Sequence, residues 1–432
     1  MISYTSTLTI GRMLFLLVIF VLTNVVAFGQ KSEVERITKT LCSPEFHGRG
    51  YVNKGDSLAA EFIVAEFKKI GLKPLKKSYF QSFNLNVNTF PNEMTVQHNG
   101  RTLTPGVHYL VDPASAGGKL ELHPKLISIE TALNVEQLIE EIKSISNGKE
   151  YNAIALDFRK LSADTLKKVA GLTEELAGMM PVFEIMDRKF TWSVADQQLK
   201  NPLIQIQDSV FLAGSNFSLS ITANLIEGYT SRNVFAYLPA KKKSKKTVVY
   251  SAHYDHLGRM GAETYFPGAN DNASGTAMLL SMANYFKENP VDYNILFIAF
   301  AGEEAGLVGS KYFVEHPLIK LNTIAFLLNL DIMGSGEDGI TVVNATLFET
   351  EFKELQAINT EKNLLKQVKS RGPAANSDHY WFTQMGVPAF FIYTMGPNKN
   401  YHDVFDTQAN LSFVEYEDIT TLLVEFTKRL KR

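Results

Sequence analysis

Histidines and carboxylates gather at five places in the C-terminal half of the chain. The first is SAHYDHLG at residues 251–258, where two histidines and an aspartate close an apolar run. One acidic residue there would mean little, because aspartate commonly caps the helix that follows a strand. Five ligand-type clusters at the ends of apolar runs, or in the loops beside them, are hard to explain as caps, and they predict a metal site. They are His253-Tyr254-Asp255, Asp271 in GANDNASG, Glu303-Glu304 after LFIAFAG, Asp331 after AFLLNL and His402 in NYHDVFD.

The types of these side chains indicate which metal they would hold. Imidazole and carboxylate ligands without a thiolate suit zinc or another first-row divalent metal. Five ligands are too many for one catalytic zinc, which takes about three protein ligands and keeps an open position. They fit two metals that share a carboxylate about 3.5–4 Å apart, where one ion polarises a carbonyl group and the pair ionises a bridging water. The predicted cofactor is therefore two Zn²⁺, with other first-row divalent metals as alternatives.

Alternating strands and helices would position these clusters. From Arg232 onward, apolar and β-rich runs such as TVVYSAH and NILFIAFA alternate with segments of helical spacing such as ASGTAMLLSMANYFKE. This alternation favours an α/β fold with a mostly parallel central sheet flanked by helices. In such sheets ligands bind beyond the carboxyl ends of the strands, which is where the clusters fall.

The segments before residue 228 complete the expected domain organisation. Residues 30–79 hold a run of helical spacing that Gly71 and Pro74 end, and we assign them to the same catalytic domain as residues 228–432. Residues 80–227 mix short alternating strands with helical segments such as NVEQLIEEIKSI and show no cluster of His, Asp and Glu. We therefore expect an inserted α/β domain there.

Taken together, the motifs resemble a known family. AHYDHLG, GANDNASG, AGEEAGLVGS, NLDIMG and YHDVFD are similar to the signature segments of the co-catalytic di-zinc aminopeptidases, metallopeptidase family twenty-eight, whose relatives include glutamate carboxypeptidases and glutaminyl cyclases. The resemblance spans residues 232–432, and GRGYVNKGDSLAAEFIVAEFKKIGLKP looks like the family's N-terminal helix segment. It implies a zinc aminopeptidase-like fold, peptide substrates and an insertion of the protease-associated type. It also implies that His253, Asp271 and Asp331 hold one zinc, and that Asp271, Glu304 and His402 hold the other.

The resemblance further implies which residues act beside the metals. Glu303 would be the general base, which takes a proton from the metal-bridging water and delivers it to the leaving amine. Asp255 would orient His253 through its other ring nitrogen, as metal-bound histidines generally require, and Asp406 would do the same for His402.

Two further residues keep a functional and a plain interpretation. Tyr401 would donate its hydroxyl to the tetrahedral oxyanion, as in some relatives, or form an aromatic wall of the pocket. Asp378 in NSDHYWF would hold a substrate amine, or cap the helix that begins near His379. His256 and His379 match no ligand position, and we expect both to be packed or hydrogen-bonded wall residues.

The predicted function is that of an exported zinc-dependent exopeptidase, in particular an aminopeptidase. Three alternatives stay open. A non-catalytic binding module of the same fold would have lost ligands, whereas all five ligands and Glu303 are present here. A glutaminyl cyclase-like acyl transferase would use one zinc. A carboxypeptidase would need a cation for the substrate's terminal carboxylate, for which Arg371 and Lys399 are candidates.

Composition and the N-terminus narrow the setting. The formal charge of −2 gives no general attraction for nucleic acid or for an anionic membrane. Arg12 precedes an apolar run, and Ala27 and Gly29 supply small residues for cleavage, so residues 1–29 are predicted to be a signal peptide. We expect a periplasmic or extracellular protein that is not inserted in the membrane after cleavage. Cys42 is the only cysteine, which rules out an internal disulfide. The sequence leaves the oligomeric state open.

Overall fold

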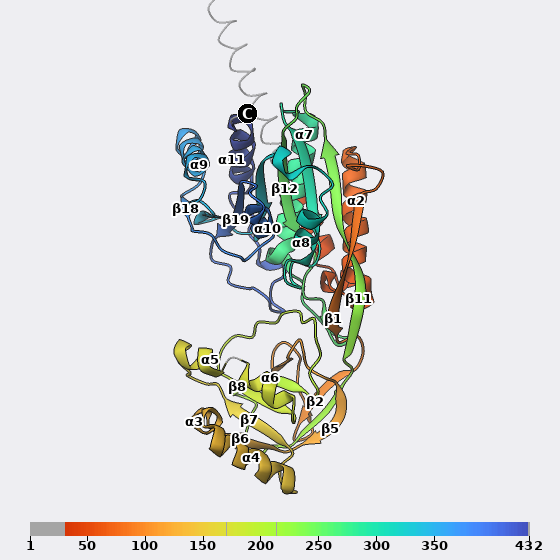
Figure 1. The fold of residues 1–432 in the computed structure, drawn as a ribbon, viewed down its shortest axis with the longest axis vertical. Helices are drawn as coiled ribbons and strands as arrows, with labels where there is room; N and C mark the ends of the chain where they lie inside the picture. Colours follow the sequence, from red (N-terminus) through yellow and green to blue (C-terminus); the bar gives the residue numbers. More distant parts are fainter. Residues whose placement is uncertain (1–30, 170, 213, 431–432) are drawn as a thin grey trace, which may run out of the picture.

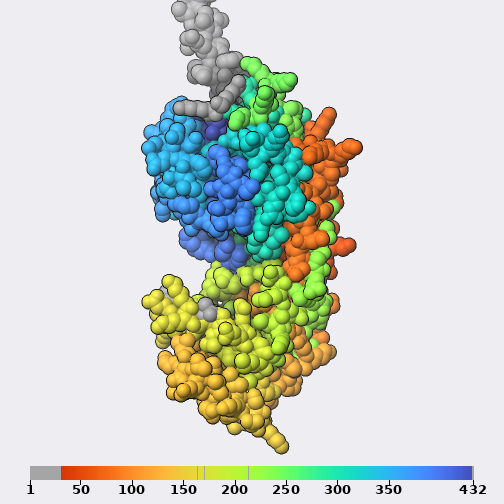
Figure 2. Space-filling model, in the orientation of Figure 1, coloured from red at the N-terminus to blue at the C-terminus, as the bar shows by residue number. Residues whose placement is uncertain are grey.

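The computed structural model describes residues 31–169, 171–212 and 214–430, and they form two units stacked along the long axis of the molecule (Figures 1 and 2). We call residues 31–89 and 224–430 the main unit, and residues 90–223 the inserted unit. The predicted signal peptide lies outside the described residues. None of the described helices is long and apolar enough to cross a membrane.

An eight-stranded sheet runs through the main unit. Its four inner strands, β15, β12, β16 and β19, are parallel to one another, and antiparallel pairings extend the sheet on both sides. The predicted α/β fold with a mostly parallel central sheet is therefore confirmed. In spatial order the strands are β1 (Phe80–Thr89), β11 (Asn224–Leu238), β15 (Asn294–Phe300), β12 (Thr247–His253), β16 (Ile324–Leu330), β19 (Ala389–Met395), β17 (Gly339–Val343) and β18 (Val368–Ser370).

Helices cover both faces of this sheet. On β12, Val248 and Tyr250 belong to the core beneath α2, α7 and α11, whereas Val249 belongs to the core beneath α8 and α10. Successive side chains of a strand point to opposite faces, so a central strand that is apolar on both sides needs both covers. The helices are α2 (Gly55–Ile70), α7 (Gly275–Glu288), α8 (Val308–Glu315), α9 (Glu349–Lys362), α10 (His379–Gln384) and α11 (Tyr416–Arg429), preceded by a helix over residues 31–41.

The inserted unit has an α/β architecture and a core of its own. Its five-stranded sheet runs in the order β4 (Tyr109–Val111), β9 (Leu203–Gln207), β8 (Val182–Met186), β7 (Ala153–Asp157), β6 (Pro124–Ile127), with the last four strands parallel. A four-stranded antiparallel sheet consists of β3 (Arg101–Thr102), β2 (Met94–His98), β10 (Phe217–Ile221) and β5 (Gly118–Leu122). The helices are α3 (Ile129–Leu133), α4 (Val135–Asn147), α5 (Ala163–Val169) and α6 (Leu172–Ala177).

Two long strands connect the units. β1 and β11 pair from Phe80 opposite Val234 to Thr89 opposite Asn224, and they extend from the main sheet toward the inserted unit (Figure 1). The expected domain boundary at residue 80 falls at the start of β1, which the structure joins to the main sheet. We therefore propose that the insertion proper lies between β1 and β11. Its core also takes in Leu257, Met260 and Phe266 of the main unit, so the two units are packed together.

Candidate metal centre

Asp271 stands between two histidines. Its Oδ1 lies 3.2 Å from Nε2 of His253, and its Oδ2 lies 3.0 Å from Nε2 of His402. His253 is the last residue of β12, and Asp271 lies in the short helical segment η3 (Ala269–Ser274). A carboxylate that turns one oxygen to each of two imidazoles has the arrangement that a ligand shared by two metals requires.

Asp331 and Glu304 complete the two sides of this cluster. Asp331 follows β16 and places Oδ1 3.3 Å from Nε2 of His253. Glu304 lies in the turn after β15 and places Oε2 3.1 Å from Nε2 of His402. The structure thus brings all five predicted ligands together, in the two groups that the resemblance implied.

The charges of the cluster fit a zinc centre. Burial alone would lower the pKa of His402, but the carboxylates of Glu304 and Asp271 outweigh it and raise that pKa to about 11. Burial raises the pKa of Glu304, yet His402 outweighs it and holds that pKa at about 2. The buried carboxylates thus require positive charge, which protons on the histidines can supply. Divalent cations would replace those protons, because metals bind neutral imidazole and ionised carboxylate.

Glu303 belongs to the same cluster. Its carboxylate lies within 4.8 Å of the ligand atoms of His253 and Asp331. Burial, with the nearby charges of Glu304 and Asp331, raises its pKa well above the ordinary value, although His253 acts in the opposite direction. Glu303 is therefore close enough to a bound water to exchange a proton with it.

Asp255 supports the cluster differently from the prediction. Nδ1 of His253 lies 3.2 Å from the backbone carbonyl oxygen of Asp255 and 3.8 Å from the carboxylate Oδ1. The carboxylate instead accepts hydrogen bonds of 3.3 Å from the backbone N–H groups of both Glu303 and Glu304. Asp255 thus orients His253 through its main chain and fixes the turn of the two glutamates through its side chain.

Asp406 does not orient His402 as the sequence analysis expected. Its carboxylate accepts hydrogen bonds from the backbone N–H groups of Asn270 and Asp271, at 2.9–3.0 Å, and so holds the loop of the shared ligand. Nδ1 of His402 lies 2.8 Å from the carbonyl oxygen of Trp192, a residue of the inserted unit.

Tyr401 and Asp378 differ in their access to substrate. Tyr401 stacks on the His402 ring, with 3.9 Å between ring centroids, and is 46% exposed. Asp378 is fully buried, which does not support the prediction that it holds a substrate amine. It occupies the position before α10 without making a capping hydrogen bond, so the alternative of a helix cap is wrong too.

The two histidines without a predicted ligand role also differ. His379 is buried and packs 5.4 Å from the ring of Phe391, as expected for a wall residue. His256 does more, because its Nδ1 lies 2.7 Å from Oε1 of Glu304. Burial lowers the pKa of His256, so the neutral ring donates its Nδ1–H to Glu304 and leaves Oε2 facing His402.

Two supporting residues escaped the sequence analysis. Ser377 donates its hydroxyl to Oδ2 of Asp331 at 2.8 Å. Arg49 is fully buried, and its guanidinium donates to backbone carbonyls that include Tyr254, Pro267 and Gly268. It thereby ties the N-terminal segment to the loop that carries Asp271. The GRG run that contains Arg49 was the only sequence signal.

The sheet and the site define an α/β metallohydrolase, with histidine and carboxylate ligands at the carboxyl ends of parallel strands. Residues 233–427 match the model of peptidase family M28, which confirms the predicted resemblance.

Known proteins show the same resemblance. Aminopeptidase YwaD of Bacillus subtilis is 40% identical over 110 residues, which are 24% of this chain and 22% of that protein. A probable leucine aminopeptidase of Arthroderma otae is 29% identical over 208 residues, 46% of this chain and 57% of the relative. The chain thus spans less than two thirds of the length of either relative. The solved structure of BSAP, a zinc aminopeptidase from Bacillus subtilis, shares the fold with a TM-score of 0.67 over 92% of this chain and 93% of that one, at 19% identity.

Proposed function

We propose that this protein is a zinc-dependent aminopeptidase that binds two Zn²⁺. The observation that carries the proposal is the carboxylate of Asp271 between the Nε2 atoms of His253 and His402, at 3.2 and 3.0 Å. The relatives named aminopeptidase support the same class of reaction. We propose further that the chain acts outside the cytoplasm, because residues 1–29 have the pattern of a signal peptide.

The surroundings of the two candidate cations favour a substrate amine over a substrate carboxylate. The candidate cations for a terminal carboxylate, Arg371 and Lys399, are exposed and bonded elsewhere, to the hydroxyl of Tyr393 and the carbonyl of Gly396.

The residues of the chain divide the remaining work. The metals, when bound, supply Lewis-acid activation of a water and of the scissile carbonyl. Glu303 takes a proton from the attacking water and delivers it to the amine that leaves. Tyr401 stands beside His402 with its hydroxyl available to the developing oxyanion. Asp255 keeps Glu303 and Glu304 in one turn, so that one carboxylate acts as base while the other binds metal.

Hydrolysis of aminoacyl-nitroanilides and short peptides by the zinc-loaded chain from Gln30 onward tests this function. Cleavage should require a free N-terminal amine. Glu303→Gln should keep the metal and lose roughly 10²–10⁴-fold in kcat, the range of general-base catalysis. Cleavage of N-terminally blocked peptides from their carboxyl end would identify a carboxypeptidase instead. Near-normal turnover by Glu303→Gln would refute the assigned base.

A further inference from the structure

A loop of the inserted unit contacts the metal ligand His402 directly. We propose that this loop, residues 189–194, is part of the metal centre, and that Trp192 is a positioning residue that sets the direction of the His402 ring. The inference rests on the proposed function, since it concerns the metals of that site. It adds a role for the inserted unit in metal binding.

The contact is reciprocal. The backbone N–H of Trp192 donates to the carbonyl oxygen of His402 at 2.8 Å, and Nδ1 of His402 lies 2.8 Å from the carbonyl oxygen of Trp192. A carbonyl oxygen can only accept, so Nδ1 must carry the proton of this hydrogen bond. Nε2 is then the nitrogen left to bind metal, and it faces Asp271 and Glu304. The loop therefore fixes both the orientation and the tautomer of this ligand.

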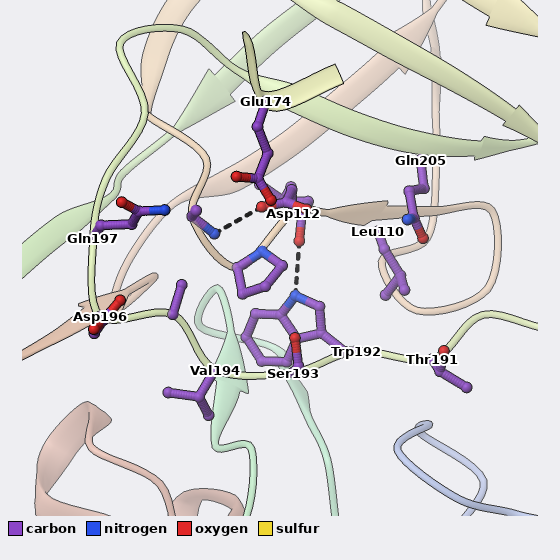
Figure 3. A pocket seen from close by; sticks show the side chains of 14 residues that line it. Leu110, Asp112, Glu174, Thr191, Trp192, Ser193, Val194, Asp196, Gln197 and Gln205 are labelled. Carbon is purple, nitrogen blue, oxygen red and sulfur yellow. Dashed lines mark hydrogen bonds between the residues drawn. The ribbon is translucent and has the colours of Figure 1, made fainter. Parts of the chain in front are cut away.

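The side chain of Trp192 anchors the loop in place. The indole N–H donates to the carbonyl oxygen of Val111 at 2.7 Å, and Figure 3 draws this hydrogen bond as the dashed line from the ring of Trp192. The ring stacks on Phe266 of the main unit with 4.7 Å between centroids, and it is 5% exposed. Trp192 thus bonds to the inserted unit on one side and packs on the main unit on the other. A smaller side chain would release the carbonyl that His402 needs.

A second attachment lies three residues earlier. The Lys189 ammonium group pairs with the carboxylate of Asp403 and donates to the carbonyl oxygen of Lys399 at 2.8 Å. Both partners belong to the segment that carries His402, which lies outside any helix or strand between β19 and η5 (Gln408–Asn410). Within this segment the carboxylate of Asp403 accepts hydrogen bonds from the backbone N–H groups of Tyr401 and Phe405. Lys189 therefore holds the group that organises the chain on both sides of His402.

The other histidine of the centre needs no such help. His253 ends a central strand, and its Nδ1 is held by the carbonyl of Asp255 only two residues further on. The partner of His402 is 210 positions away in the sequence. The metal bound by Asp271, Glu304 and His402 should therefore depend on the inserted unit, whereas the metal bound by His253, Asp271 and Asp331 should not.

Metal titration of the full chain tests this inference, with Zn²⁺ or Co²⁺ alone as the probe and a chromophoric chelator as competitor. Trp192→Ala should weaken one of the two equivalents by about 10-fold, in the range measured when a ligand's hydrogen-bond partner is lost, and leave the other unchanged. Trp192→Phe keeps the stacking ring and should restore most of the lost affinity. The matched control is Ile145→Ala, which opens the core of the inserted unit on α4, at the far end of that unit (Figure 1).

The outcomes separate this inference from its alternatives. Equal affinity of both equivalents in folded Trp192→Ala would overturn it, and so would an equal loss in Ile145→Ala, which would indicate general destabilisation. If Trp192→Ala does not fold, Lys189→Met tests the same attachment without opening a core, and it should again weaken a single equivalent. A parent chain that binds no metal would instead overturn the proposed function, and this inference with it.

Discussion

At the carboxyl ends of their parallel strands, the two α/β sheets of this chain carry the same kind of side chain in different surroundings. In the inserted unit, Asp157 ends β7 and Asp187 follows β8. Asp157 binds the guanidinium of Arg159 at 2.6 and 2.8 Å, and Asp187 accepts a hydrogen bond from the backbone N–H of Lys160. In the main unit, Asp271 and the strand-end Asp331 face histidine nitrogens instead.

The difference lies in burial and in the type of partner. The side chain of Asp157 is 33% exposed, so water solvates its charge. The ion pair with Arg159, two residues further on, is then enough to stabilise the carboxylate. The side chain of Asp271 is 5% exposed, and a charge at that depth is stable only beside positive charge. Acidic residues at strand ends therefore do not define a site by themselves. Buried acidic residues whose carboxylates lie beside the same histidine nitrogens indicate a candidate metal site.

The largest effect is expected from substitution at the strand end of the main sheet, with the matching strand end of the inserted unit as the control. His253→Ala removes a proposed metal ligand and should lower metal content and activity together, by more than the roughly 100-fold that loss of a ligand's hydrogen-bond partner costs. Asp157→Asn removes a carboxylate from the equivalent place in the other sheet, and it should leave metal content, activity and, within about 0.5 kcal/mol, stability unchanged. Metal analysis and peptidase assays of both variants provide the measurement. Loss of metal from Asp157→Asn would break the comparison.

A smaller effect is expected from the residue that holds Glu304. His256→Phe keeps a buried ring but removes the N–H that Glu304 accepts at 2.7 Å. Affinity for the metal on the Glu304 side should fall about 10–100-fold. His256→Asn places an amide N–H near the same position and should retain most of the affinity. Competition with a chelator measures both variants, and equal affinities would show that this hydrogen bond does not orient Glu304.

His256 also illustrates what could not be predicted from the sequence. The parallel sheet and the gathering of the five proposed ligands could be predicted, because each of these residues closes or closely follows an apolar run whose pattern defines a strand or loop. The partners of those ligands could not. His256 lies three residues from His253 in the same motif, yet its ring reaches the opposite side of the centre. Nothing local assigns Asp406 to the loop of Asp271 rather than to His402.

The same limit applies between the two units. Residues 80–227 lack ligand clusters, and this difference from their flanks predicts an insertion between the segments of the main unit. Nothing in the sequence connects Trp192 with His402. Periodicity indicates which face of an element is buried, but not which distant loop covers that face. The strand β1 shows the same effect. The expected boundary at residue 80 falls at its first residue, but pairing with β11 decides which sheet it joins.

The smallest effect concerns a carboxylate of the inserted unit that has no cation beside it. Asp112 lines a cavity of about 320 Å³ with Glu174 and Asp196, and the described residues around that cavity include no histidine, lysine or arginine (Figure 3). Burial, with the charges of Glu184 and Glu174, raises the pKa of Asp112 from 3.8 to about 6. Unlike Asp271, this group is therefore destabilised when it ionises.

Substitution of Asp112 by asparagine should stabilise the protein in a pH-dependent way. The folded chain keeps the Asp112 proton up to a higher pH than the unfolded chain, so stability falls as the pH rises from 3.8 to about 6, and the full cost is present at pH 7. Asp112→Asn keeps an oxygen for the N–H of Ala114 and carries no charge. It should add about 2 kcal/mol at pH 7, by the 1.36 kcal/mol per pKa unit and an allowance for partial exposure, and almost nothing near pH 4. Thermal unfolding of variant and parent at both pH values measures the difference. A variant that is destabilised, and more so at pH 7 than at pH 4, would mean that Asp112, like the carboxylates of the metal centre, has a cationic partner.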